Sequence, residues 1–113
     1  MFRSILIVIL LATITGCVGF PALRDANRTK LSTLEPDMSR AQVISIMGSD
    51  GFMEIKNPYK RESFAIGEDK YEVLYYYTDF IQEHQPMDTG MTPVVLKNGK
   101  FIGAGKEFLF KIR

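Results

Sequence analysis

The chain contains 113 residues, of which 46% are hydrophobic, and its formal net charge is +1. This composition is typical of one small globular domain and excludes a collagen-like, low-complexity or strongly charged disordered chain. The balance of 14 basic and 13 acidic residues excludes nucleic-acid binding by bulk electrostatic attraction. A single cysteine excludes an internal disulfide bond, and a single histidine leaves little scope for metal or nucleophile chemistry.

The first sixteen residues have the pattern of an export signal. Arg3 is their only charged side chain, and residues 5–14 form an apolar run that only Thr13 interrupts. A membrane-spanning helix needs roughly 20 apolar residues, so this run is too short to span a bilayer and fits the apolar core of a signal peptide. We therefore predict that residues 1–16 are a signal peptide, and that the mature chain has equal numbers of acidic and basic side chains.

The end of this segment, Ile14 to Cys17, resembles the bacterial lipobox, in which an aliphatic residue and two small residues precede a cysteine. The resemblance implies cleavage between Gly16 and Cys17 and transfer of a diacylglyceryl group to the sulfur of Cys17. Two or three acyl chains hold a protein stably on a membrane, whereas one chain does so only marginally. The alternatives are a plain signal peptide, or an uncleaved anchor, in which Cys17 has no such role.

The residue after the cysteine is Val18 rather than aspartate. In enterobacterial lipoproteins this implies transport to the outer membrane, where the domain faces the periplasm. Residues 17–22 are then the lipidated cysteine and a short tether, and residues 23–113 are one domain.

Two helices are predicted at the start of the domain. Leu23 to Leu34 carries apolar residues at helical spacing, and Pro36 prevents the helix from continuing. A second helix is predicted over residues 40–47 by the signals at its two ends. Ser39 and Gln42 form a capping box, Met38 and Val43 form a hydrophobic staple, and Gly48 suits the position after the last turn.

Strand patterns follow the second helix. Residues 52–55 predict a short strand, and residues 62–66 and 71–79 predict a hairpin with a four-residue loop. Residues 92–97 and 100–104 predict a second hairpin, because Asn98 and Gly99 suit a type I′ turn with positive φ at both positions. Gly103 and Gly105 suggest a bulge or a close backbone approach.

The last segment, residues 106–112, alternates apolar side chains and predicts a final strand. The expected fold class is therefore α+β, with two short N-terminal helices packed on one face of an antiparallel meander of three to five strands. The other face of this two-layer fold is left for water, a partner or the membrane. Tyr75, Tyr76 and Tyr77 put aromatic side chains on both faces, so we predict them as partner-binding residues.

Residues 31–48 resemble the SmpA/OmlA (BamE-like) family of small bacterial outer-membrane lipoproteins. The matching positions are the capping and staple residues Met38, Ser39, Gln42 and Val43, and the closing Met47-Gly48. The family usually has glycine where this chain has Asp37. The late hairpin around Asn98 and Gly99 also fits uncharacterised lipoproteins with a fold like that of β-lactamase inhibitory protein.

No motif for catalysis, a metal or a cofactor stands out. His84 lies in a polar loop without a cysteine partner and is interpreted as a solvated residue. None of the serines lies in a Gly-x-Ser-x-Gly elbow that would pair it with this histidine. A carboxylate pair such as Glu62 and Glu72 has no local signature, so the sequence leaves it open. Residues Asn27 to Thr29 match an N-glycosylation sequon. The lipobox implies a bacterial protein, so we give this match no weight.

These observations predict a lipid-anchored envelope lipoprotein without enzymatic activity or cofactor. The resemblance implies an interaction or scaffold module in outer-membrane assembly or integrity, with the membrane and an envelope protein as its partners and no nucleic acid. The alternative is a periplasmic inhibitor or ligand-binding module with a fold like that of β-lactamase inhibitory protein. A small envelope hydrolase is a third hypothesis and requires convergent carboxylates in a cleft.

Overall fold

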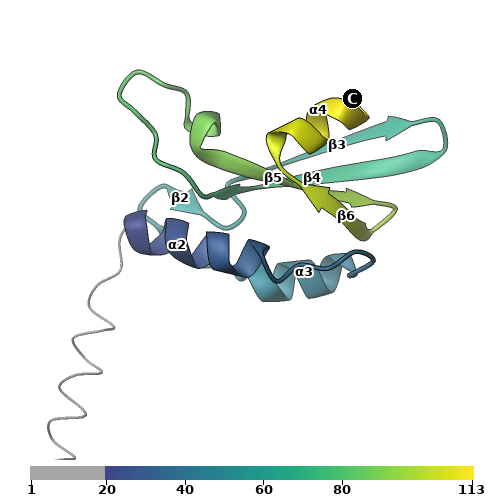
Figure 1. Cartoon of the computed structure of the whole chain (residues 1–113), viewed down its shortest axis with the longest axis horizontal. Helices are drawn as coiled ribbons and strands as arrows, with labels where there is room; N and C mark the ends of the chain where they lie inside the picture. The colour runs from purple at the N-terminus through teal and green to yellow at the C-terminus, as the bar shows by residue number, and fades with distance from the viewer. Residues whose placement is uncertain (1–19) are drawn as a thin grey trace, which may run out of the picture.

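A computed structural model describes residues 20–113 and confirms the predicted α+β fold (Figure 1). The elements in chain order are α2 (Phe20–Leu31), α3 (Arg40–Met47), β1 (Gly51–Phe52), β2 (Ile55–Lys56), β3 (Lys60–Ile66), β4 (Asp69–Tyr77), the 3-10 turn η1 (Met87–Gly90), β5 (Met91–Lys97), β6 (Lys100–Ala104) and α4 (Lys106–Ile112). Strands β3 to β6 form an antiparallel sheet in chain order, and β1 and β2 form a separate hairpin. The predicted signal peptide, Gly16 and Cys17 lie outside the described residues.

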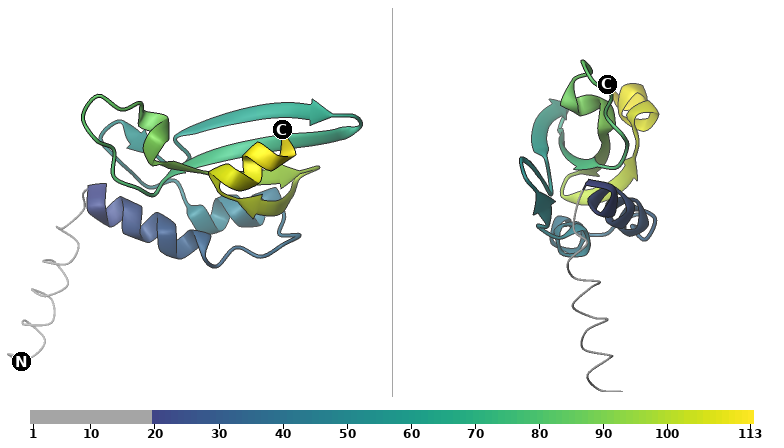
Figure 2. Two further views of the ribbon diagram at one scale, coloured as in Figure 1. Left: turned by 45° about the horizontal axis from the view of Figure 1, so that its top comes forward. Right: turned by 90° about the vertical axis from the view of Figure 1, so that its left-hand side faces the viewer.

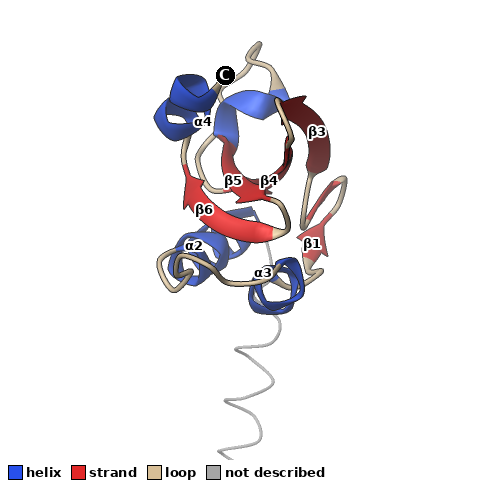
Figure 3. Ribbon diagram, turned by 90° about the vertical axis from the view of Figure 1, so that its right-hand side faces the viewer, coloured by secondary structure: helices blue, strands red, loops and turns tan. Residues whose placement is uncertain are grey.

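The helices lie on both sides of the four-stranded sheet. Helices α2 and α3 lie on one side and α4 on the other, and the strands curve around the side that carries α4 (Figures 2 and 3). The core under α3 contains Val43, Met47, Leu74, Tyr76, Val94, Leu96 and Phe101. The second core contains Val73, Tyr75, Tyr77, Met91, Val95 and Leu109 on the α4 side, and it is joined by Leu23 of α2 and Ile55 of β2.

Helix α3 confirms the predicted end signals. The Ser39 hydroxyl accepts a hydrogen bond from the Gln42 backbone N–H at 3.2 Å, and the Gln42 side chain accepts one from the Ser39 N–H at 2.9 Å. Met38 packs against the cluster that contains Val43. Gly48 ends the helix at φ 73° and donates its N–H to the Ile44 carbonyl.

Helix α2 begins and ends three residues earlier than the predicted range. Pro21 lies in its first turn, where the missing N–H has no cost. The Ser32 and Thr33 hydroxyls donate to the last carbonyls of the helix, so the helix stops well before Pro36. Residues 20–22, predicted as tether, are therefore helical.

The late hairpin has the predicted type I′ geometry, with φ 52° at Asn98 and 81° at Gly99. Gly103 confirms the predicted bulge, because the strand pairing shifts between Gly103 and Phe101. It also confirms the close backbone approach, because a Cβ at Gly103 would lie 2.6 Å from the Phe108 ring. The β3–β4 turn is tighter than predicted, with only Gly67 and Glu68 between the strands.

The predicted strand over residues 52–55 is wrong in detail, because the chain reverses within it. Met53 has φ 55°, and Phe52 pairs with Ile55 across a tight turn between β1 and β2. Two residues on each arm are too few for an alternating pattern to show.

The predicted strand over residues 106–112 is wrong, because this segment is helix α4. Phe108, Leu109 and Ile112 share one helical face, and of these Leu109 is the most buried, at 8% exposed. The alternation that suggested a strand includes Phe110, which is 83% exposed. Leu109 packs against the sheet. Glu107 in the first turn and Lys111 in the last turn have the charges that the helix dipole favours at those ends.

Candidate functional site

The three predicted partner-binding tyrosines lie in the core. Tyr75, Tyr76 and Tyr77 are 9%, 0% and 4% exposed. Helix α4, which the sequence did not predict, covers the face of Tyr75, while α3 covers that of Tyr76. The three side chains therefore form no partner-binding surface in this fold, and the site must be sought elsewhere.

An open cleft of about 770 Å³ lies between α2 and α4. Arg28 and Leu31 of α2 form one wall, and four residues of α4 form the other. The floor comes from the ends of β4, β5 and β6. The α4 residues are Lys106, Glu107, Phe108 and Lys111, and the floor residues are Thr78, Met91, Thr92, Ala104 and Gly105.

The cleft exists because β6 is shorter than β5. The last pair between them is Val94 with Ala104, and the Gly105 N–H then donates to the Pro93 carbonyl. Pro93 has no N–H to return, so the ladder cannot continue along β5. Gly105 has φ 109°, a conformation that favours glycine, and directs the chain away into α4.

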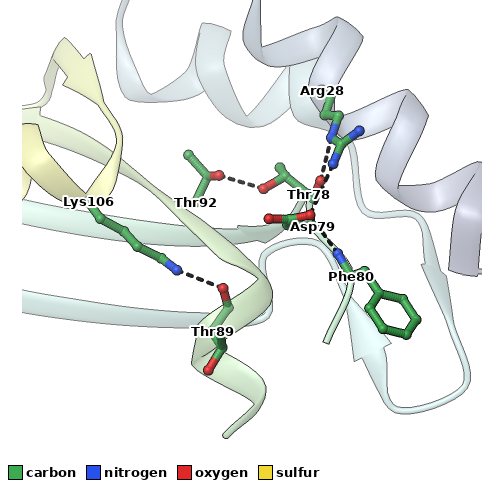
Figure 4. A network of polar contacts seen from close by, with 7 residues as sticks. All are labelled: Arg28, Thr78, Asp79, Phe80, Thr89, Thr92 and Lys106. Atoms are coloured by element: carbon green, nitrogen blue, oxygen red, sulfur yellow. Dashed lines mark hydrogen bonds and ion pairs between the residues drawn. The ribbon is translucent and has the colours of Figure 1, made fainter. Parts of the chain in front are cut away.

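A polar network fixes the α2 wall (Figure 4). The Arg28 guanidinium donates to the Thr78 carbonyl at 2.5 Å and to the Asp79 carboxylate at 3.3 Å. The Thr78 and Thr92 hydroxyls share a hydrogen bond of 2.5 Å across β4 and β5. The Arg28 side chain therefore keeps its charge in a set position beside the cleft.

The α4 wall is fixed by contacts along the helix. Lys106 donates to the Thr89 carbonyl at 2.6 Å, and the Phe108 ring lies against the backbone of Gly103. At the other end Arg113 donates to the Glu62 carboxylate at 3.0 Å. Both cleft walls are thus rigid elements that present charged side chains.

A buried amide pair joins α2 to the sheet behind the cleft. Asn27 and Asn57 exchange hydrogen bonds of 3.0 and 2.7 Å, and their amide groups also donate to the Tyr77 and Met47 carbonyls. Asn27 is 0% exposed, so its amide is inaccessible for glycosylation. This role of Asn27 was not predicted. The available signal was its position four residues from both Leu23 and Leu31, in the middle of the apolar stripe of α2.

The groups weighed for catalysis do not converge. Glu62 accepts a hydrogen bond from Tyr75 on the α4 side of the sheet, whereas Glu72 pairs with Arg40 of α3 on the other side. His84 is an exposed loop residue and does not line the cleft. Within residues 20–113, no group of three or more His, Cys, Asp or Glu side chains could hold a metal ion.

Burial and hydrogen bonding shift several pKa values. Burial, with the hydrogen bond to Glu62, raises the pKa of Tyr75 to about 12. Burial is also the main cause that raises the pKa of Tyr76 to about 12, against the Arg40 charge, which lowers it, and together with the Glu72 charge, which raises it. The hydrogen bond from Tyr75 lowers the pKa of Glu62, and the Arg113 charge lowers it further. The Asn98 side chain lowers the pKa of Asp69 at the neighbouring hairpin. These shifts arise from core and turn contacts rather than from the cleft.

The structure defines a small α+β domain with an open cleft between α2 and α4 that is lined by charged side chains. Residues 18–110 match the family described as "Protein of unknown function (DUF3192)", and the chain belongs to this family. Neither the curated proteins nor the solved structures include a match. Within residues 20–113, no helix has the length and apolar character needed to cross a membrane.

Proposed function

We propose that this protein is a lipid-anchored envelope lipoprotein whose domain binds another envelope protein and has no enzymatic activity. The lipobox resemblance at Ile14 to Cys17 supports the anchor, and Val18 supports the outer membrane of a Gram-negative bacterium as its location. The resemblance of residues 31–48 to the SmpA/OmlA family supports a role in outer-membrane assembly or integrity.

The cleft between α2 and α4 carries the proposal of protein binding. Its walls offer Arg28, Lys106 and Lys111 as cations and Asp79 and Glu107 as anions. Apolar side chains lie among them, and the cleft is open to solvent. Small-molecule sites are mostly apolar and enclose their ligand, whereas mixed polar and apolar surfaces are usual where proteins meet. An extended or helical segment of a partner is therefore the occupant that fits best.

The anchor is tested with the cysteine itself. The mature protein, isolated from envelopes, should begin at Cys17 and carry the mass of its acyl chains. The Cys17→Ser variant should lose membrane attachment, because its hydroxyl does not accept the diacylglyceryl group. A processed Cys17→Ser chain that stays in the membrane fraction contradicts the anchor.

The partner is tested by purification of the lipidated chain in mild detergent after light crosslinking. A defined envelope protein should co-purify, and the yield should fall severalfold with Lys111→Glu in the cleft. Lys70→Glu makes the same charge change on an exposed residue outside the cleft and should leave the yield unchanged. A chain that migrates alone contradicts the proposal.

The cleft volume also favours the alternative of an inhibitor or ligand-binding module. A volume of about 770 Å³ lies within the usual range for sites that hold small molecules. Tight inhibition of an envelope hydrolase, weakened by Lys111→Glu, would favour this alternative over a scaffold.

A further inference from the structure

We infer that the end of the domain at which α2 begins is a membrane-contacting surface, with Phe20, Met53, Phe80 and Met87 in the lipid interface. We call these four residues the apolar end. The inference deepens the proposed function and rests on it, because it takes the bilayer that holds acylated Cys17 as the partner. It assigns an orientation to the domain, with the apolar end toward the lipid.

The distribution of exposed apolar side chains supports this surface. Six large hydrophobic residues are exposed within residues 20–113, and four of them form the apolar end. Phe80 is 64% and Met53 80% exposed. The other two, Ile66 and Phe110, lie singly at the β3–β4 turn and on α4, and isolated exposed residues need no explanation.

Direct contacts show that these residues share one end of the molecule. Phe20, Phe80 and Met87 line a shallow hollow of about 430 Å³ together with Ile81. The Phe20 ring lies 4.6 Å from that of Phe52, which directly precedes Met53. Figure 1 shows the start of α2, the β1–β2 hairpin and the loop after β4 together at its left-hand side.

The loop that presents Phe80 and Met87 is closed at its base. The Thr78 and Asp79 N–H groups both donate to the Gly90 carbonyl, at 2.9 and 3.1 Å. A Cβ at Gly90 would lie 2.4 Å from the Ile81 side chain, so this close approach requires glycine. The loop thus presents the Phe80 ring outward on a fixed base. Exposure of this apolar surface to water is unfavourable.

The short chain between Cys17 and α2 favours lipid as the partner that covers the apolar end. Only Val18 and Gly19 separate Cys17 from Phe20, and three extended residues reach at most about 11 Å. The headgroup region of one leaflet is about 5–8 Å thick, so Phe20 must lie at or near it. Aromatic side chains favour this interfacial layer, and amphipathic elements bury apolar groups about 5–10 Å deep there.

A cation accompanies the apolar surface. Arg24 also lines the hollow, and its guanidinium lies 5.9 Å from the centre of the Phe80 ring. Its Nε is buried without a hydrogen-bond partner among the described residues. A lipid phosphate beside the ring would give this guanidinium an acceptor.

The test uses the fact that the chain contains no tryptophan. Phe80→Trp places one fluorophore in the apolar end, and Phe110→Trp is the control on an exposed phenylalanine of α4, whose exposure is 83% against 64% for Phe80. Each mature, lipidated variant, which begins at acylated Cys17, is reconstituted in phosphatidylethanolamine and phosphatidylglycerol vesicles with and without bromine on the acyl chains. The Phe80→Trp emission should fall about twofold with brominated lipid and shift to shorter wavelength, whereas the Phe110→Trp emission should not change.

Flotation and intact mass separate the two ways of failing. An acylated chain that floats with the vesicles but shows equal quenching in both variants contradicts the membrane-contacting surface alone. A chain without acyl mass that does not float contradicts the proposed anchor, and the surface inference with it.

Discussion

The two faces of the four-stranded sheet are covered to different degrees. In the core under α3, six of the seven residues have no exposed surface, whereas only Val73 and Val95 reach that level among the eight of the second core. Helix α3 has capped ends, while α4 begins at Gly105 without a side-chain cap. The α3 face is therefore the structural base of the domain, and the looser α4 face is the one that borders the cleft.

The largest expected effect comes from a cavity in the α3 face. Leu74→Ala should lower the free energy of unfolding by about 3 kcal/mol, because Leu74 is fully enclosed and the site cannot collapse. Leu109→Ala on α4 should have a smaller effect, about 2 kcal/mol, because its site is open at one side. Urea denaturation of both variants measures the difference. Equal losses would remove the distinction between the faces.

The buried amide pair should matter almost as much. Asn27→Ala should lower stability by about 2 kcal/mol, because the Asn57 amide and the Tyr77 carbonyl lose buried partners. Asn57→Ala should have a similar effect, and the double variant should lose much less than the sum. Additive losses would show that the two side chains do not act as a pair.

The contact of α4 with the sheet should be weakened by one methyl group. Gly103→Ala would place a Cβ within 3 Å of the Phe108 ring and should cost about 1–2 kcal/mol. Hydrogen exchange should then speed up in α4 and remain unchanged in α3. In a Phe108→Ala background the methyl group at position 103 meets no ring, so Gly103→Ala should cause little further loss there. A further loss as large as in the parent chain would contradict the proposed clash.

Ionisation of Tyr75 and Tyr76 should destabilise the fold at alkaline pH. Their folded-state pKa of about 12 exceeds the unfolded value of 10.0, so the neutral rings stabilise the fold below about pH 10. This contribution is lost as the pH rises from 10 to 12. Absorbance at the phenolate band measures the titration, and Tyr76→Phe should remove one late step while keeping stability at neutral pH. An unchanged titration curve in that variant would contradict the assignment to Tyr76.

The smallest effect concerns the residue before the capping motif. Asp37 has φ 70°, a left-handed conformation that favours glycine. Asp37→Gly should raise stability by less than about 1 kcal/mol, because it relieves the left-handed backbone of a non-glycine residue. Thermal unfolding measures the change, and a marked loss would show that the Asp37 side chain itself is needed.

Local signals explain which elements could be predicted. The capping residues Ser39 and Gln42 and the turn residues Asn98 and Gly99 act within a few residues, so the sequence showed both the helix and the hairpin. The seven residues of α4 are too few to separate an alternating pattern from a helical one, and packing of Leu109 on the sheet decides between them.

The cleft depends on contacts that are distant in sequence. Its position follows from the end of the ladder at Pro93 and from the direction of the chain after Gly105. The pairing of Asn27 with Asn57 spans 30 residues, and no local sequence pattern indicates which residue either amide binds. The predicted tyrosine surface is wrong because residues 106–112 form a helix that covers one sheet face, whereas a strand there would leave that face bare.

The proposed function places an envelope protein in the cleft between α2 and α4. Its most direct test is site-specific photo-crosslinking in living cells, with the reactive residue at Lys111 in the cleft or at Glu68 in the distant β3–β4 turn. We expect a discrete protein adduct from position 111 and none from position 68, in a chain that keeps Cys17. No adduct at position 111, or the same adducts from both positions, would contradict this proposal.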